Sequence, residues 1–127
     1  MAGYHVRITA GSVACTATLE QNRTAWAIWN ALPIEGRANL WGDEIYFEIP
    51  VDLAEDEARA EVAVGDLAYW PPGSALCIFW GATPASTGRE PRAASPVNVF
   101  GRIDKGATNF GAVKNGTLVR IEQLEMR

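Results

Sequence analysis

The segment Gly65 to Gly81, GDLAYWPPGSALCIFWG, constrains the fold more than any other part of the sequence. Two apolar runs, Val62 to Trp70 and Leu76 to Trp80, flank Pro71-Pro72-Gly73. Proline fixes φ, and glycine can adopt the positive φ that a tight turn often needs. The pattern therefore predicts a β-hairpin, around which the other strands have to close.

Composition supports one all-β domain over residues 1–127. The chain is 48% apolar, which is ordinary for a globular domain, and 12 glycines with 7 prolines divide it into many short elements. A chain of this length can bury a true core without disulfides.

Alternating apolar and polar residues predict most of the remaining strands. Residues 4–8 and 13–19 alternate on either side of a turn and form an expected opening hairpin. Further strands are expected at 43–49, 97–103 and 118–124, the last with a bulge because Leu118, Ile121 and Leu124 are spaced by three. About eight strands result, and closing them into a barrel would remove exposed edges.

One helix is expected between the strands. Ala25, Ile28, Trp29 and Leu32 share a helical face, Asn22 or Thr24 can cap its start, and Pro33 ends it. Its two tryptophans could form a binding face, but we expect the helix to cap the end of the barrel with bulky side chains.

Charge and hydropathy argue against nucleic-acid and membrane partners. The net charge is −4, and residues 43–61 carry eight carboxylates opposed only by Arg59, which disfavours contact with a phosphate backbone. No apolar run approaches the ~20 residues of a membrane span, and residues 1–11 do not resemble a signal peptide. A cytoplasmic location is expected. Arg89 and Arg92 fall in a polar loop predicted at 82–96, where they are expected to be solvated.

The sequence carries no metal or cofactor motif. Cys15 and Cys77 are far apart, have no CxxC spacing, and His5 is the only histidine in the chain. Both cysteines are predicted to be buried free thiols, with no metal and no cofactor.

Two carboxylates at 44 and 48 invite comparison with a glycosidase pair. Glu44 and Glu48 share a strand face opposite the apolar Ile45, Phe47 and Ile49. Such neighbours usually form a solvated face, and nothing in the sequence marks either for a raised pKa.

Longer blocks point to a family. AIWNALP, ANLWGDEIYFEIP, VGDLAYWPPGSALCIFWGATP and SPVNVFGRI, within roughly residues 4–122, closely resemble small prokaryotic proteins grouped as a cyclophilin-like domain of unknown function. The resemblance implies a closed eight-stranded β-barrel with one or two short helices. True cyclophilins isomerise X-Pro bonds with an arginine, a glutamine and an apolar pocket, but their FMxQGGD run has no counterpart here, and no arginine of this chain can be matched to theirs.

The matched blocks suggest an aromatic pocket with a few polar groups, typical of a small-molecule or peptide site. Many of these aromatics could instead fill the barrel, and we expect this of Phe79 and Tyr69. The candidate ligand-binding residues are Trp41, Glu44, Tyr46, Trp70, Phe79, Ser95 and Asn98.

Three functions follow as hypotheses. The preferred one is a non-catalytic barrel that binds a small molecule or a proline-containing peptide. The alternatives are a divergent peptidyl-prolyl isomerase and an enzyme that uses Glu44 or Glu48 as a base, or Ser95 as a nucleophile. No catalytic residue can be assigned, and the oligomeric state stays open.

Overall fold

The predicted central hairpin is present in the computed structural model, which describes residues 4–124. Strand β7 (Asp66–Trp70) and strand β8 (Ala75–Phe79) pair antiparallel through the short 3-10 helix η1 (Pro71–Gly73). The sequence suggested a positive φ at Gly73, but the positive φ of the turn is at Ser74 (47°). Strand β7 also starts later than predicted, at Asp66, so that Val64 precedes it and is 48% exposed.

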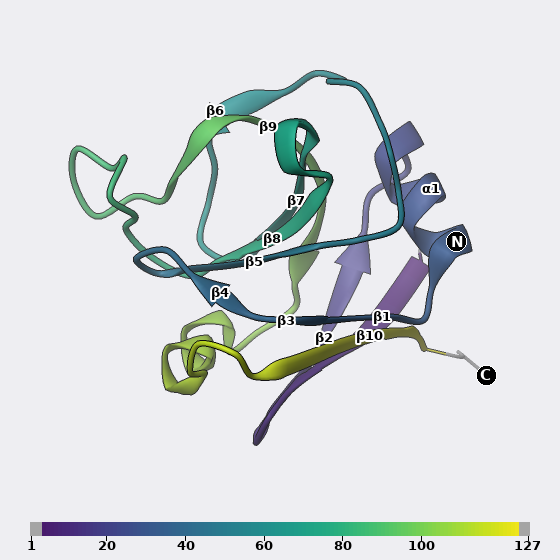
Figure 1. The fold of residues 1–127 in the computed structure, drawn as a ribbon, viewed down its shortest axis with the longest axis horizontal. Helices are drawn as coiled ribbons and strands as arrows, with labels where there is room; N and C mark the ends of the chain where they lie inside the picture. The colour runs from purple at the N-terminus through teal and green to yellow at the C-terminus, as the bar shows by residue number, and fades with distance from the viewer. Residues whose placement is uncertain (1–3, 125–127) are drawn as a thin grey trace.

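The remaining elements follow the chain shown in Figure 1. They are β1 (Tyr4–Ala10), β2 (Val13–Leu19), α1 (Arg23–Ala31), β3 (Ile34–Arg37), β4 (Asn39–Leu40), β5 (Glu44–Glu48), β6 (Arg59–Glu61), β9 (Arg92–Ile103), η2 (Ala107–Ala112) and β10 (Leu118–Gln123). All strand pairs are antiparallel, in the order β3-β10-β1-β2-β9-β7-β8-β5-β4, with β6 paired to β9.

The expectation of a closed eight-stranded barrel is wrong in two respects. The described residues form ten strands, and their hydrogen-bonded path does not close on itself. The two end strands, β3 and β4, are nevertheless consecutive in the chain, with only Ala38 between them. Ala38 donates its N–H to the Thr117 carbonyl and accepts from Gly116 N–H, both at 2.8 Å. The two edges of the sheet therefore meet through the chain and not through a ladder.

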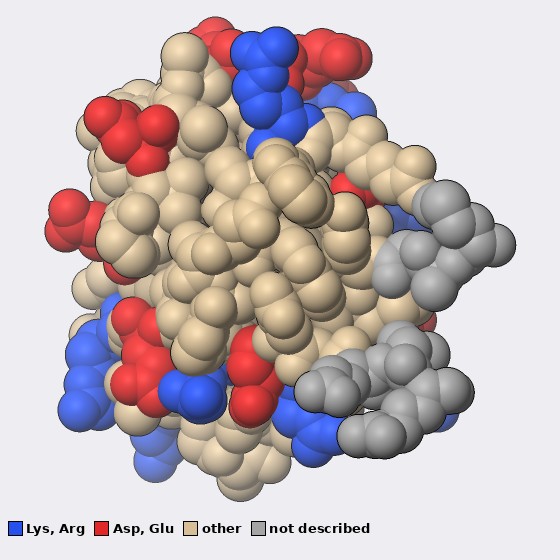
Figure 2. All heavy atoms as spheres, turned by 90° about the vertical axis from the view of Figure 1, so that its right-hand side faces the viewer, with Lys and Arg blue, Asp and Glu red and all other residues tan. Residues whose placement is uncertain are grey.

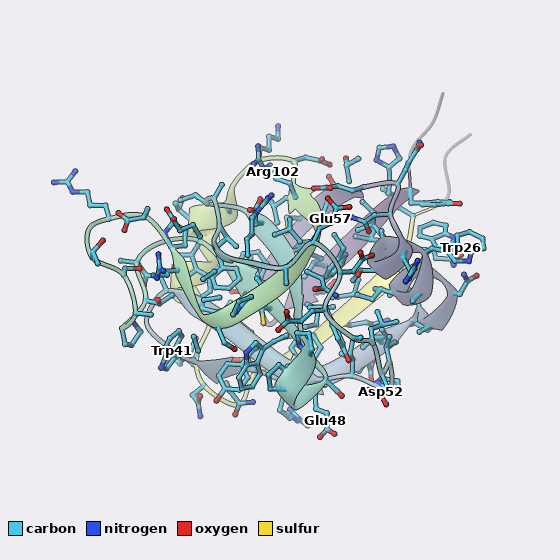
Figure 3. All side chains as sticks on the ribbon, turned by 90° about the horizontal axis from the view of Figure 1, so that it is seen from above. Trp26, Trp41, Glu48, Asp52, Glu57 and Arg102 are labelled. Carbon is cyan, nitrogen blue, oxygen red and sulfur yellow. The ribbon has the colours of Figure 1, made fainter. Side chains whose placement is uncertain are left out.

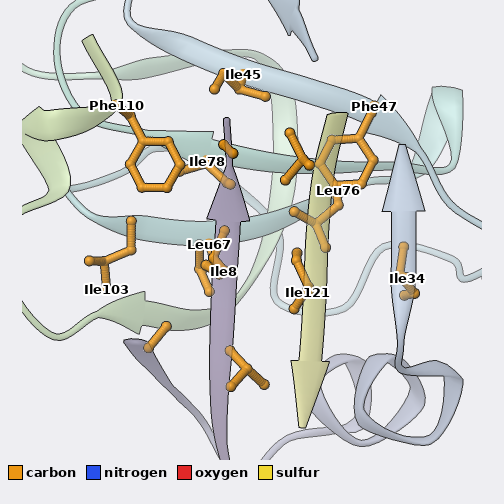
Figure 4. Close-up of a cluster of buried hydrophobic side chains, with 14 of the residues drawn as sticks. Ile8, Ile34, Ile45, Phe47, Leu67, Leu76, Ile78, Ile103, Phe110 and Ile121 are labelled. Carbon is orange, nitrogen blue, oxygen red and sulfur yellow. The ribbon is translucent and has the colours of Figure 1, made fainter. Parts of the chain in front are cut away.

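The inner core lies within the curved sheet, as Figure 4 shows. Ile45, Phe47 and Ile49 are at most 4% exposed, which confirms the predicted apolar face of β5. Opposite them, Gly36 of β3 leaves room for the Phe47 ring, because a Cβ at Gly36 would lie 2.4 Å from Phe47 Cδ2. Burial of these large side chains is the main favourable contribution to the stability of the sheet.

Helix α1 begins where the sequence predicted. The Asn22 side chain accepts from Ala25 N–H at 2.8 Å, and Ile28 is 1% exposed in the inner core. Trp29 stacks on Tyr4 with ring centroids 4.7 Å apart, whereas Trp26 is 53% exposed.

Figure 2 shows that the centre of the face seen from this side of the molecule is largely uncharged, with acidic and basic side chains towards its rim.

Two segments differ from their predicted boundaries, and a third lacks its predicted bulge. Strand β6 forms within the acidic residues 43–61, at a place where no strand was predicted, and β9 begins at Arg92, inside the predicted 82–96 loop. Strand β10 pairs with β1 without a register shift, so the expected bulge is absent from this ladder. Its inward side chains are Val119 and Ile121, which alternate regularly, while Leu118 is 42% exposed.

The central strands are buried on both faces. Besides the inner core, a second group of buried side chains lies on the outer face of β7 and β8, beneath the first half of β9. We call this the outer cluster, and its buried members are Ala68, Cys77, Phe79, Ala93 and Val97. Burial on both sides explains why β8, ALCIF, is a continuous apolar run with no polar face.

Candidate ligand pocket

A pocket of about 200 Å³ opens at the edge of the outer cluster. Four of the predicted candidate residues line it together with smaller apolar side chains. The lining residues are Trp41, Glu44, Tyr46, Trp70, Cys77, Ala93, Ala94 and Val97.

Strands β5 and β8 form the floor. Their register places Tyr46 directly opposite Cys77, and Glu44 opposite Phe79. Directly opposed residues of an antiparallel pair project to the same face, and diagonal neighbours remain within reach of long side chains. Glu44, Tyr46 and Cys77 therefore converge on one spot of the outer face.

Trp70 forms a wall that is fixed at two points. Its indole Nε1 donates to Ser95 Oγ at 2.7 Å, which ties the ring to β9. A Cβ at Gly73 would lie 2.7 Å from Trp70 Cζ3, so the ring packs against the bare backbone of η1. The PPG turn thus contributes to the pocket by giving Trp70 a surface to rest on.

The opposite wall is the start of β9. Ala93, Ala94 and Val97 contribute no polar side chain to this wall. The buried Thr83 hydroxyl donates to the Arg92 carbonyl and so fixes where this strand begins. Arg92 Nη1 lies 3.9 Å from Glu61 Oε1 of β6, and Arg92 is not among the lining residues.

Trp41 stands in the tight connection between β4 and β5. Its backbone N–H donates to the Glu44 carbonyl at 2.9 Å, and Gly42 has the positive φ (60°) that the turn requires. Asp43 ties this turn to the end of the central hairpin, because Trp80 N–H donates to the Asp43 carbonyl at 3.0 Å. In Figure 3, Trp41 lies at one end of the molecule and Trp26 at the other.

The Glu44 carboxyl is the polar group that distinguishes this pocket. Glu44 is only 5% exposed, and burial raises the pKa of its carboxyl from 4.5 to about 7, against a smaller lowering by the neighbouring Cys77 thiol. Burial, reinforced by the Glu44 charge, raises the pKa of the Cys77 thiol well above its usual 9.0. Within residues 4–124, no arginine, lysine or histidine forms an ion pair with Glu44.

The other predicted site residues lie elsewhere. Ser95 positions Trp70 and does not line the pocket, and Phe79 is fully buried in the outer cluster. Asn98 is 1% exposed and accepts from Asp56 N–H at 2.9 Å while donating to the Ala54 carbonyl at 3.0 Å. It thereby ties the acidic segment to β9, away from the pocket.

The comparison with a glycosidase pair is not supported. Glu48 is exposed and absent from the pocket lining, and it points outward in Figure 3. The expectation of a solvated face is wrong for Glu44, which is 5% exposed and lines the pocket together with residues of β9.

Sequence reasoning missed four lining residues: Cys77, Ala93, Ala94 and Val97. Cys77 is a buried free thiol as predicted, whereas Cys15 is only half-buried. The available signal was the uninterrupted apolar run of β8, which requires a covering layer. Nothing in the sequence identified 92–97 as that layer.

The described part of the chain offers no cluster of three or more His, Cys, Asp or Glu side chains suited to a metal ion. Among its helices, none has the length and apolar character needed to cross a bilayer.

Comparisons with known proteins agree on the fold. The sequence profile of the family described as Cyclophilin-like matches residues 4–122. The solution structure of the hypothetical protein AF2241 from Archaeoglobus fulgidus has 39% identity, a TM-score of 0.81, and coverage of 96% of this chain and 95% of that one. The structure of McbB in complex with tryptophan has 15% identity and a TM-score of 0.71, covering 96% of this chain but 45% of McbB, so it shows the fold alone. The curated proteins gave no match.

Proposed function

Because this chain belongs to the Cyclophilin-like family, in which the fold does not by itself define an activity, we propose its function from the pocket. We infer that the protein binds a small molecule between Trp41, Tyr46 and Trp70, above the carboxyl of Glu44. The observation that carries this proposal is the buried Glu44 carboxyl, which faces a preformed aromatic pocket and has no ion-pair partner among the described residues.

The volume favours a small molecule over an extended peptide. The pocket holds about 200 Å³. A cavity of ~150 Å³ is enough for benzene, whereas sites for drug-sized ligands occupy roughly 300–1,000 Å³. The expected ligand therefore has one or two rings.

The construction of the pocket also supports binding. Trp70 is held by Ser95 and by the backbone at Gly73, so its ring needs little reorganisation to receive a ligand. Preorganised walls lower the entropic cost of binding. McbB, which shares this fold over part of its length, was solved with tryptophan, and this lends general support to a small aromatic ligand.

A metabolite screen by thermal shift, together with native mass spectrometry of the purified protein, tests the proposal. We expect at least one small planar metabolite to raise the Tm of the wild type, because a ligand that binds only the folded state stabilises it. Trp41→Ala should lose this effect. Trp26→Ala is the matched control, since Trp26 is exposed and outside the pocket.

Two results would contradict the proposal. One is that no metabolite stabilises the wild type and no co-purified molecule is detected. The other is that Trp26→Ala loses ligand stabilisation to the same extent as Trp41→Ala, which would mean that the pocket has no special part in binding.

The position of Glu44 also favours a second function, general acid–base catalysis on the bound molecule. A carboxyl whose pKa is about 7 can both accept and donate a proton near neutral pH. In that case Glu44→Gln would still bind the metabolite but would abolish its turnover. A metabolite that binds and is recovered unchanged supports the non-catalytic function.

A further inference from the structure

Building on the proposed function, we propose that the pocket selects a flat organic cation, such as an amidinium or guanidinium group attached to a small ring. The cation would donate N–H groups to the Glu44 carboxylate and stack on the aromatic walls. The shape of the pocket alone does not define this class of ligand.

Glu44 is an acid without a cationic partner among the described residues. Glu44 is 5% exposed, yet the four ion pairs found within residues 4–124 all involve other carboxylates, on Glu35, Glu61, Asp66 and Glu122. The neighbouring Cys77 thiol is a weak donor, and its own hydrogen bond goes to the Ala75 carbonyl at 4.0 Å. A buried carboxylate gains most from a charged donor, because charge-assisted hydrogen bonds are the strong ones. A bound cation would supply that donor.

The walls of the pocket are aromatic and carry no positive charge. Trp41, Tyr46 and Trp70 present three aromatic rings and no lysine or arginine lines the pocket. The negative faces of such rings attract cations, and tryptophan does so most strongly. Aromatic walls around one carboxylate therefore favour a positive ligand over a neutral one and disfavour an anion.

One side of the pocket favours an apolar group on the remainder of the ligand. Ala93, Ala94 and Val97 form an apolar wall with no side-chain hydrogen-bonding group. A ligand in contact with them gains by presenting a ring or an alkyl group on that side. A planar cation joined to one small ring satisfies the acidic floor, the aromatic walls and this apolar side together.

Titratable groups around Glu44 are few. Tyr46 comes from its own strand and Cys77 from β8, while Trp41 and the β9 residues in the lining contribute no ionisable group. Binding of a cation requires Glu44 to be ionised. The affinity of the pocket for the cation should therefore increase as the pH rises through about 7. Below that pH, Glu44 releases a proton when the cation binds.

Benzamidine and benzamide provide a matched pair of probes, since they have nearly the same shape and differ in charge. Isothermal titration calorimetry of the intact protein at pH 8 should show benzamidine binding at least about tenfold more tightly, the order expected for hydrogen bonds to a charged group. Glu44→Gln should abolish this preference. Glu48→Gln, on the same strand but exposed, is the control and should retain it.

Three outcomes would overturn the inference: equal affinity for the two probes, an unchanged preference in Glu44→Gln, or no binding of benzamidine at millimolar concentrations. Far-ultraviolet circular dichroism establishes that each variant is folded. If the screen finds neutral metabolites whose stabilising effect depends on Trp41 while benzamidine does not bind, the binding function stands and the preference for a cation fails. If neither class binds, both fail.

Discussion

Glu44 of β5 and Cys77 of β8 are diagonal neighbours on the outer face of the sheet, and the two side chains line the same pocket. Burial raises the cost of ionising both groups, and the Glu44 charge raises the pKa of Cys77 further, whereas Cys77 slightly lowers the pKa of Glu44. The pair therefore stays protonated to a higher pH than either group would in water. This arrangement leads to a prediction for each residue.

Glu44→Gln should change how stability depends on pH. The pKa of Glu44 is about 7 in the folded protein and 4.5 ordinarily, so the folded state binds the additional proton between these values. Its contribution to stability is thus fully present below about 4.5 and is lost as the pH rises through about 7. Urea unfolding should show Glu44→Gln to be more stable than the wild type at pH 8, by up to about 3 kcal/mol.

At pH 4.5 the same two proteins should differ little in stability, because protonated glutamic acid and glutamine have similar shapes. Glu48→Gln serves as the control and should give no such pH-dependent difference. A Glu44→Gln variant that is less stable than the wild type at pH 8 would contradict the burial of an uncompensated carboxylate.

Cys77 should be modified much more slowly than Cys15. Cys77 is 2% exposed and its pKa is well above 9.0, whereas Cys15 is half-buried and has a pKa of about 11. Only the thiolate reacts readily, and access limits it further. Alkylation with iodoacetamide at pH 8, followed by peptide mass spectrometry, should label Cys15 first, and urea should remove the difference. Faster labelling of Cys77 in the native protein would show that the pocket floor is open.

Asn98→Ala should destabilise the fold without altering ligand selectivity. Removing the amide leaves Asp56 N–H and the Ala54 carbonyl without their side-chain partner, and it also removes a 3.2 Å hydrogen bond to Thr24. We expect a loss of about 2–4 kcal/mol in the free energy of unfolding. Denaturant titration measures this loss. An unchanged stability together with a lost preference for benzamidine would instead make Asn98 a binding residue.

Gly36→Ala should weaken the join between the two ends of the sheet. The added methyl group would overlap the Phe47 ring, and overpacking typically costs about 1–3 kcal/mol. Gly111→Ala is the matched control, because its Cβ would meet nothing closer than Trp80 Nε1 at 3.7 Å. Thermal unfolding of both variants should show a lower Tm for Gly36→Ala alone, and equal Tm values would contradict the close packing at β3.

Local signals in the sequence were sufficient for most of the strands and for the helix. Alternation located β1, β2 and β5, and Asn22 marked the start of α1. Strands β3 and β4 were missed because they are four and two residues long and have no repeated apolar alternation. The way in which the two edges of the sheet meet depends on contacts of Ala38 with residues far away in the chain. No local sequence pattern predicts such contacts.

The pocket was predictable in part. Four of the seven candidates, Trp41, Glu44, Tyr46 and Trp70, come together in its lining. The position of Asn98 could not be deduced, because its partners are 42 to 74 residues away in the chain. The raised pKa of Glu44 also depended on tertiary structure, since its burial comes from residues of other elements that line the same pocket.

The central claim is that Glu44 is a buried carboxyl with no cation of its own, facing the pocket. A ¹³C NMR titration of its side-chain carboxyl in the ligand-free protein tests this most directly. The account predicts a midpoint near pH 7, shifted to lower pH when benzamidine is bound. A midpoint near the ordinary 4.5 in the free protein would show that Glu44 is solvated or already paired, and would contradict the account.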